Sequence, residues 1–264
     1  MTLKMRTNRT NLIFVPPAPR LAVSVAGAGD LVLFLHGIRG NRHNWELQLE
    51  AFSKHFRAAA WDARGYGDSD DYEGPLAFDD FTADVLRVSD HLEARRLHLV
   101  GLSMGGRIAR NFALRHPERV KTLTLVGTTP GFDALTPEQV QKFVAERRNA
   151  TPESLRRLLG SKARGGAFED LMQSVAAVRE KPYLKTLEAS VAQDRASPLE
   201  DIRAPTLVVA GSEDSVYPLP IARDMARRIP GAELAVIEGA GHLVNLEQPE
   251  RFNDIVLAFL RRHC

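Results

Sequence analysis

Gly101-Leu102-Ser103-Met104-Gly105-Gly106 is the stretch that decides the fold expected for this chain of 264 residues. The apolar run 97–100 precedes it, and apolar residues at helical spacing follow it. A serine between glycines, placed between a strand and a helix, is typical of a nucleophile elbow. The sharp turn needs small neighbours, and the helix that follows points its N-terminus at the hydroxyl, which favours developing negative charge. Ser103 is therefore the candidate nucleophile, with an ordinary serine in a tight turn as the alternative.

Short apolar runs that end near a glycine or a polar residue recur on both sides of this elbow. Such runs, without strict alternation, predict strands that are buried on both faces of a parallel sheet. Helical patterns lie between the runs, and the segment 20–25 predicts an earlier antiparallel strand. The sequence therefore predicts an α/β fold with a mostly parallel central sheet and helices on both faces. The predicted parallel strands are 31–35, 58–61, 97–100, 123–126, 207–210 and 234–237.

The segment 132–196 interrupts this alternation, because it contains no convincing strand. Thr136-Pro137 and Thr151-Pro152 each indicate a helix start, with a threonine cap followed by a proline in the first turn. A third apolar pattern follows them. A helical insertion of this length is too long for a plain loop and should cover the edge of the sheet where the strands end. The predicted domains are an α/β core of residues 1–131 and 197–264, and a helical cap of residues 132–196.

A serine nucleophile needs a general base, and the chain offers eight histidines. His242 closes the loop Gly239-Ala240-Gly241-His242 after the last predicted strand, so we expect it at the carboxyl edge of the sheet. His36 ends a strand and is expected to brace a loop, and His43 begins a predicted helix. His242 is therefore the candidate base. The other histidines lie in helical or polar contexts and are expected at the surface: His55, His91, His98, His116 and His263.

The base in turn needs a carboxylate that holds its tautomer and stabilises the imidazolium. Gly211-Ser212-Glu213-Asp214 follows the strand before the one that leads to His242, which makes Asp214 the first candidate. Glu213 beside it and Asp62 after an earlier strand remain alternatives.

A tetrahedral intermediate needs main-chain N–H donors near the nucleophile. Met104 follows Ser103 directly, so its N–H is one candidate donor. His36-Gly37-Ile38 ends a strand and opens a loop, which makes the N–H of Ile38 the second candidate. Removal of one such donor typically lowers the rate about 10²- to 10³-fold.

Taken together, these pieces resemble α/β-hydrolase-fold proteins over nearly the whole chain. The resemblance implies a Ser103–Asp214–His242 triad in that chain order. It also implies an oxyanion hole from Ile38 and Met104, a helical cap, and no metal or other cofactor. The matching pieces are His36-Gly37, Trp45, Asp62-Ala63-Arg64-Gly65-Tyr66-Gly67-Asp68-Ser69, the elbow at Ser103, the turn from Gly211 to Asp214, and Gly241-His242.

Within that family the chain most resembles the small lactonase and carboxylesterase branch, including 3-oxoadipate enol-lactonase, where a G-x-S-M-G-G elbow is common. This resemblance implies hydrolysis of a small ester or lactone through an acyl-enzyme. C–C bond hydrolases of the meta-cleavage type are similar too, but Leu102 and Arg39-Gly40-Asn41 depart from their pattern. A ligand-binding receptor with little turnover is the third alternative. Ser103 argues against haloalkane dehalogenases and epoxide hydrolases, which use an aspartate nucleophile.

Candidate substrate contacts come from the neighbours of the catalytic groups and from the cap. An apolar lining is typical of small-ligand sites. Two arginines could bind a substrate carboxylate through a forked contact, with ordinary solvated arginines as the alternative. The predicted apolar contacts are Trp45, Leu102, Phe132, Phe143, Val216, Tyr217 and Leu243, and the predicted arginines are Arg39 and Arg147.

Composition limits the other classes of function. Hydrophobic residues make up 44% and charged residues 26%, and 35 basic against 33 acidic residues leave a net charge of +2, which does not favour nucleic-acid binding. No apolar run approaches the roughly 20 residues that cross a bilayer. Cys264 alone cannot form an intrachain disulfide, and no HExxH spacing indicates zinc. The apolar stretch 12–15 is too short for a secretory signal, so we expect a cytoplasmic protein with a small-molecule substrate. The oligomeric state stays open.

Overall fold

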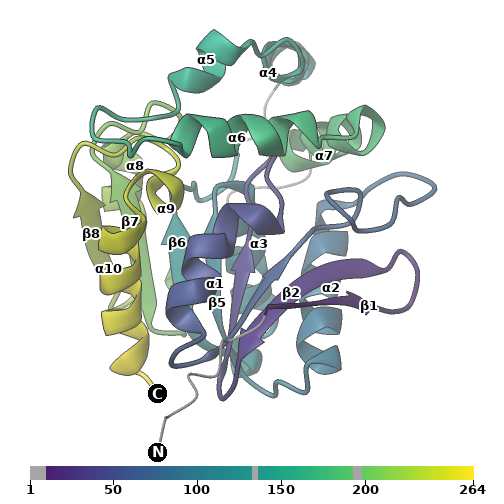
Figure 1. The fold of residues 1–264 in the computed structure, drawn as a ribbon. Helices are drawn as coiled ribbons and strands as arrows, with labels where there is room; N and C mark the ends of the chain where they lie inside the picture. The colour runs from purple at the N-terminus through teal and green to yellow at the C-terminus, as the bar shows by residue number, and fades with distance from the viewer. Residues whose placement is uncertain (1–9, 133–135, 193–197) are drawn as a thin grey trace, which may run out of the picture.

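The computed structural model describes residues 10–132, 136–192 and 198–264. Its strands form one eight-stranded sheet in the order β1-β2-β4-β3-β5-β6-β7-β8 (Figure 1). Strands β3 to β8 are parallel to one another, whereas β2 pairs antiparallel with β1 and β4. The predicted fold class is therefore confirmed. The strands are β1 Asn11–Val15, β2 Leu21–Gly27, β3 Leu31–Leu35, β4 Arg57–Trp61, β5 Leu97–Leu102, β6 Val120–Val126, β7 Thr206–Gly211 and β8 Glu233–Ile237.

Helices cover both faces of this sheet because the central strands are apolar on both sides. Along β3, Leu31, Leu33 and Leu35 join the hydrophobic core under α2, α3 and α8, while Val32 and Phe34 join the core under α1 and α10. This period of two is the geometry of an extended strand. The helices of this part are α1 Glu46–Phe52, α2 Phe78–His91, α3 Met104–Arg115, α8 Leu219–Arg228, α9 Val244–Glu247 and α10 Pro249–Arg261, with short 3-10 turns at Arg42–Trp45, Pro117–Arg119 and Leu199–Asp201.

Four helices between β6 and β7 lie together over one end of the sheet (Figure 1). Thr136 accepts a hydrogen bond from the Gln139 N–H, and Thr151 accepts one from the Ser154 N–H, so both threonines cap helices as expected. These caps begin α4 and α5, and α4 packs on α7. We call this segment the cap. Its helices are α4 Pro137–Arg148, α5 Pro152–Arg156, α6 Ala167–Ala176 and α7 Glu180–Ala192.

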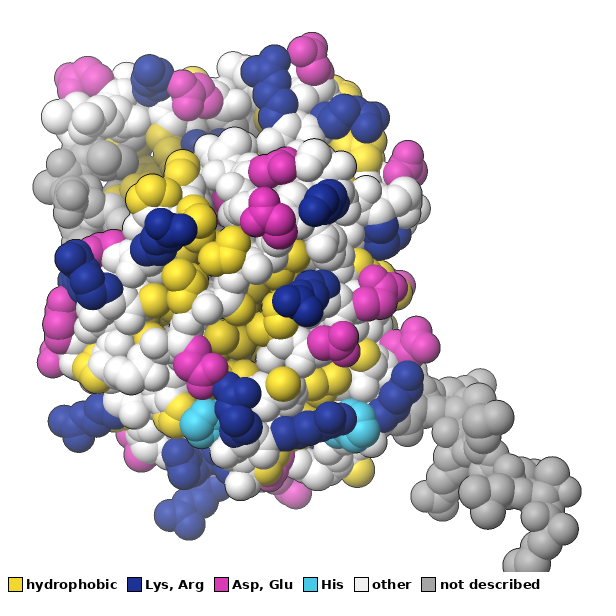
Figure 2. All heavy atoms as spheres, turned by 90° about the vertical axis from the view of Figure 1, so that its left-hand side faces the viewer, with side chains coloured by type: hydrophobic (Ala, Val, Ile, Leu, Met, Phe, Trp, Pro, Cys, Tyr) yellow, Lys and Arg dark blue, Asp and Glu magenta, His cyan; other side chains and the backbone are white. Residues whose placement is uncertain are grey.

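The edge strand β8 is less covered than the strands at the centre. Leu234 on this strand is 37% exposed, and hydrophobic side chains gather on the side of the molecule that carries β8 (Figure 2). Glu233 at the start of the strand forms an ion pair with Arg262 at 2.6 Å. A charged pair at an open edge discourages pairing with another strand. No helix within the described ranges is long and apolar enough to span a membrane.

His98 corrects one sequence expectation, because it is fully buried on β5 and not at the surface. Its Nδ1 lies 2.8 Å from the Thr122 hydroxyl, and its ring packs edge-on against Phe56. The polar context in the sequence was misleading: a residue in the middle of a central strand must point into one of the two covered faces.

Burial, together with nearby Lys121, lowers the pKa of His98 from 6.5 to about 4. The unfolded chain therefore binds more protons than the folded chain between these two values, so stability falls as the pH falls through this window. We expect His98 alone to lower the free energy of unfolding by about 2 kcal/mol between about pH 7 and about pH 5. Chemical denaturation at both pH values checks this. A His98→Asn variant should lack this part of the pH dependence, and an unchanged slope in it would contradict the assignment.

Candidate active site

Ser103 stands at the turn between β5 and α3 with an unusual backbone conformation. Its φ is +53° and its ψ is −113°, a backbone region in which residues other than glycine are strained. A Cβ on Gly101 would lie 2.2 Å from the carbonyl oxygen of Gly105, and a Cβ on Gly105 would lie 2.1 Å from that of Leu35. The glycines of the elbow are therefore required by space. Strain of this kind persists only where the surrounding structure enforces it. The turn places the Ser103 side chain above the sheet.

Asp214 and His242 meet at the carboxyl ends of β7 and β8. His242 Nδ1 lies 2.9 Å from Asp214 Oδ2, and both residues are almost completely buried. The other carboxylate oxygen of Asp214 accepts the N–H groups of Val216 and Tyr217 at 2.8 and 3.0 Å. Burial by itself would raise the pKa of Asp214. The hydrogen bond to His242, the charge of His242 and the N–H groups of Val216 and Tyr217 outweigh burial, so the pKa of Asp214 is lowered. Asp214 is thus an ionised partner for the imidazole.

The two alternative carboxylates have other partners. Asp62 accepts the N–H groups of Arg42 and Asp68 and forms a buried ion pair with the Arg42 guanidinium. Glu213 accepts both the N–H and the hydroxyl of Ser161 at 2.7 Å. Asp214 is accordingly the carboxylate that meets the candidate base.

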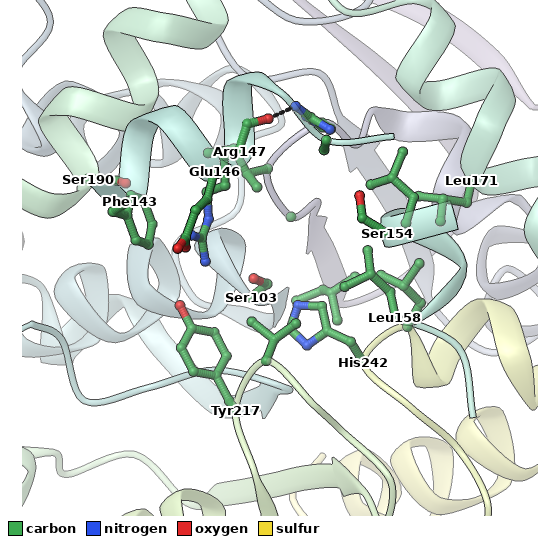
Figure 3. A pocket seen from close by; sticks show the side chains of 18 of the residues that line it. Ser103, Phe143, Glu146, Arg147, Ser154, Leu158, Leu171, Ser190, Tyr217 and His242 are labelled. Carbon is green, nitrogen blue, oxygen red and sulfur yellow. Dashed lines mark hydrogen bonds between the residues drawn. The ribbon is translucent and has the colours of Figure 1, made fainter. Parts of the chain in front are cut away.

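Ser103 and His242 line the same cavity, which has a volume of about 260 Å³. Figure 3 shows the imidazole beside Ser103. Because Nδ1 faces Asp214, Nε2 is the ring nitrogen left to accept a proton. No hydrogen bond joins the two side chains within the described part of the chain. Such bonds are commonly long before a substrate binds and tighten in the reacting complex.

The loop after β3 passes directly over the elbow. A Cβ on Gly37 would lie 3.3 Å from Ser103 Cβ, and Ile38 lines the cavity. His36 holds this loop: its Nδ1 lies 2.7 Å from the Gly37 carbonyl oxygen, and its Nε2 lies 3.1 Å from the N–H of Ala63. Met104 is the first residue of α3, so its N–H has no partner inside the helix. Its side chain is buried in the core, which leaves the main chain as its only contribution to the site.

The two candidate arginines differ in what they bind. Arg39 donates from Nε to the Tyr183 hydroxyl at 2.8 Å and from its terminal nitrogen to the Arg147 carbonyl oxygen, so it ties the loop to the cap. Arg147 extends from α4 into the cavity (Figure 3), and its guanidinium lies 3.4 Å from the centre of the Phe143 ring. Arg147 makes no ion pair within 4 Å with any residue in the described ranges, although Glu146, which lines the same cavity, acts on it electrostatically. Burial lowers the pKa of Arg147, but a guanidinium remains charged at neutral pH.

A sequence model described as the alpha/beta hydrolase family matches residues 32–255. The chain belongs to the alpha/beta hydrolase family. It is 33% identical over 263 residues to a 2-hydroxy-6-oxononadienedioate/2-hydroxy-6-oxononatrienedioate hydrolase of Burkholderia vietnamiensis, covering 92% of this chain and 91% of that protein.

Other relatives of this alpha/beta hydrolase carry different activities in their names. A dihydrolipoyllysine-residue acetyltransferase component of the acetoin cleaving system of Pseudomonas putida is 32% identical; the match covers 89% of this chain and only 64% of that protein. A malate-bound esterase from Thermogutta terrifontis has a TM-score of 0.83 at 30% identity, covering 97% and 100% of the two chains. The enol-lactonase of Burkholderia xenovorans LB400 has a TM-score of 0.79 at 26% identity, covering 92% and 96%.

Most predicted contact residues of this alpha/beta hydrolase line the cavity, but two do not. Trp45 is fully buried and packs on Phe34 and Phe252, because the 3-10 turn that carries it points its side chain into the core. Phe132 packs edge-on against Phe143, with 5.6 Å between the ring centres, and is not among the residues that line the cavity. Trp45 therefore points into the core and away from the cavity, whereas a substrate contact of Phe132, which packs against cavity residues Phe143 and Arg107, stays a prediction. The predicted residues that do line the cavity are Ile38, Arg39, Leu102, Phe143, Arg147, Val216, Tyr217 and Leu243.

Several cavity residues were absent from the sequence prediction. Arg107 lies one helical turn after Ser103 on α3, and this spacing could have indicated it. Its guanidinium donates to the Ser190 carbonyl oxygen at 2.9 Å and lies over the Phe78 ring, so it holds α3 against α7. The cap residues on the cavity wall carry no local signal, since only the packing of the cap decides which side chains face inward. They include Glu146, Leu155, Leu158, Leu171, Tyr183 and Ser190.

Proposed function

We propose that this protein is a serine hydrolase that cleaves small carboxylic esters or lactones through an acyl-enzyme. The observation that carries this proposal is the hydrogen bond between Asp214 and His242, with the imidazole beside Ser103 and its strained backbone in one cavity. This arrangement has the parts of a hydroxyl nucleophile, its base and an orienting carboxylate.

The reaction follows from these positions. Ser103 Oγ bonds to the substrate carbonyl carbon while His242 Nε2 takes the hydroxyl proton. The tetrahedral intermediate collapses to the acyl-serine, and the leaving alkoxide oxygen takes that proton from the imidazolium. A water then attacks the acyl carbon with His242 again as base, and Ser103 leaves with the proton. In a lactone the leaving oxygen stays attached to the acyl chain.

The N–H groups of Ile38 and Met104 are proposed as the oxyanion hole. The two donors lie on the loop and the helix that meet at Ser103, as the close approach of Gly37 to the serine supports. Developing negative charge would also lie at the N-terminus of α3, where the helix dipole stabilises it.

The cavity supports a small substrate with an apolar part. Its volume of about 260 Å³ is below the range of drug-sized ligand sites, and Leu102, Leu158 and Leu243 contribute apolar wall. The second candidate function is hydrolysis of a C–C bond, which the name of the Burkholderia vietnamiensis relative favours. Purified protein tested on p-nitrophenyl esters, an enol-lactone and a ring-cleavage dienone separates the two. Tight binding of one of these compounds without turnover would indicate a receptor instead.

Arg147 is proposed as the binding group for a substrate carboxylate, because it is a half-buried cation in the cavity and makes no ion pair within 4 Å in the described residues. A forked contact between a guanidinium and a carboxylate contributes about 1.5–3 kcal/mol. We expect Arg147→Leu to raise KM roughly tenfold or more for a p-nitrophenyl ester whose acyl chain ends in a carboxylate. KM for the neutral ester of equal length should change little.

Arg148→Leu is the matched control for this prediction. Arg148 is the next residue on α4, but it lies at the surface and pairs with Glu180 at 3.2 Å. Equal changes in KM for the charged and neutral esters in Arg147→Leu would show that Arg147 shapes the cavity and does not bind an anion.

A further inference from the structure

The cap is attached directly to the loop that carries His242. Residues 157–164, between α5 and α6, run beside residues 239–243. The His242 N–H donates to the Leu158 carbonyl oxygen at 2.7 Å, and the Lys162 N–H donates to that of Gly239 at 2.8 Å. The two chains approach so closely that a Cβ on Gly241 would lie 2.4 Å from the Leu158 oxygen. We call this contact the seam.

Glu247 lies at the centre of the seam and is completely buried. Its Oε2 accepts the N–H groups of Gly241 at 2.8 Å and Gly160 at 2.7 Å, and its Oε1 accepts the N–H of Leu243 at 2.8 Å. Glu247 makes no ion pair with any residue of the described ranges. Burial raises the pKa of Glu247 above its usual value, while the three main-chain donors and nearby His242 favour the charged form. A buried carboxyl group of this kind is costly unless all three bonds form.

Two of these donors flank His242 in the sequence, and the third belongs to the cap. One carboxylate thus fixes the peptide groups on both sides of the imidazole-bearing residue and joins them to Gly160. A displacement of about 1 Å in a catalytic group can lower a rate about 100-fold, so a backbone clamp at this position matters for the reaction. Glu247 does not line the cavity, and its side-chain hydrogen bonds all go to main-chain N–H groups, two of which flank His242. Its effect therefore passes through the main chain of His242, together with an electrostatic interaction with that residue.

We propose that Glu247 is a positioning residue that holds His242 in line with Ser103 and Asp214 and couples this position to the cap. The proposal rests on the proposed hydrolase function. The two carboxylate oxygens of Glu247 accept three hydrogen bonds. A glutamine in its place has only one acceptor oxygen, and its NH₂ group would face at least one N–H donor and could not accept from it.

Glu247→Gln tests the proposal, with Ser161→Ala as the matched control. Ser161 is the neighbour of Gly160 on the seam, but its hydroxyl binds Glu213 and not the His242 loop. We expect kcat per folded site to fall about 10- to 100-fold in Glu247→Gln, with KM nearly unchanged, and to stay near the wild-type value in Ser161→Ala. If Glu247→Gln does not fold, Glu247→Asp carries the same test, because it keeps the charge but is one methylene too short to reach both sides of the loop.

A second measurement requires no substrate. The Nδ1 proton between His242 and Asp214 should give a low-field proton resonance, and this resonance should shift or broaden in the Glu247 variant but not in Ser161→Ala. A variant that melts earlier while kcat per folded site and this resonance are unchanged would show a merely structural role and overturn the proposal. If the wild-type protein hydrolyses no ester or lactone, the proposed function fails, and the resonance still reports on the position of His242.

Discussion

Replacing Ser103 with alanine should lower kcat for p-nitrophenyl acetate by at least about 10⁴-fold. The variant keeps the cavity, the proposed oxyanion donors and the Asp214–His242 pair, so a small residual rate above that in water is expected. The measurement is the initial rate of nitrophenol release by equal amounts of folded wild type and variant. A fluorophosphonate, which reacts with an activated serine, should add its mass to the wild type at residue 103 and add nothing to the variant.

Ser190→Ala is a useful comparison, because Ser190 is a second serine on the cavity wall whose hydroxyl is bound to the Leu187 carbonyl oxygen. It should retain most of the activity. Equal activity in wild type and Ser103→Ala would refute Ser103 as the nucleophile and remove the acyl-enzyme mechanism.

Replacing Asp214 with asparagine should lower kcat about 10⁴-fold while the protein remains folded. The backbone N–H groups of Val216 and Tyr217 can still bind the amide oxygen at the Oδ1 position. The amide NH₂ then faces His242 Nδ1 and favours the tautomer that carries its proton on Nε2, so the imidazole cannot accept the proton of Ser103. The loss should appear in kcat and leave KM comparatively unchanged.

Glu213→Gln provides the control, since this neighbouring carboxylate is exposed and binds Ser161. It should retain activity. A large loss in Glu213→Gln together with an active Asp214→Asn protein would reverse the assignment of the orienting carboxylate.

The features that the sequence predicted well depend on local constraints. The elbow at Ser103 requires glycines at Gly101 and Gly105, because a Cβ at either position would lie only 2.1–2.2 Å from a neighbouring carbonyl oxygen. The buried strands follow from apolar runs, because a strand covered on both faces cannot carry many polar side chains. Asp214 and His242 were indicated by their places after successive strands, since parallel strands end at the same edge of a sheet.

The features that the sequence missed depend on packing between distant segments. The strand β1 was not predicted because it is an edge strand with one exposed face, on which Leu12 lies, and such a strand carries a weak apolar signal. Trp45 is near the loop after β3 in the sequence, but the turn that carries it directs the ring into the core. Glu247 resembles an ordinary surface glutamate on a short helix. Two of its N–H partners lie within six residues of it, but the third, Gly160, comes only from the approach of the cap.

The sequence by itself determined the class of fold and the chemical groups offered for catalysis, because glycine spacing, strand patterns and residue types act within a few residues of the chain. The tertiary structure alone decided what each cavity arginine binds and how the cap is joined to His242. These depend on the meeting of α4, α7 and residues 157–164 with loops more than 50 positions away, and such contacts arise from the packing of the whole chain.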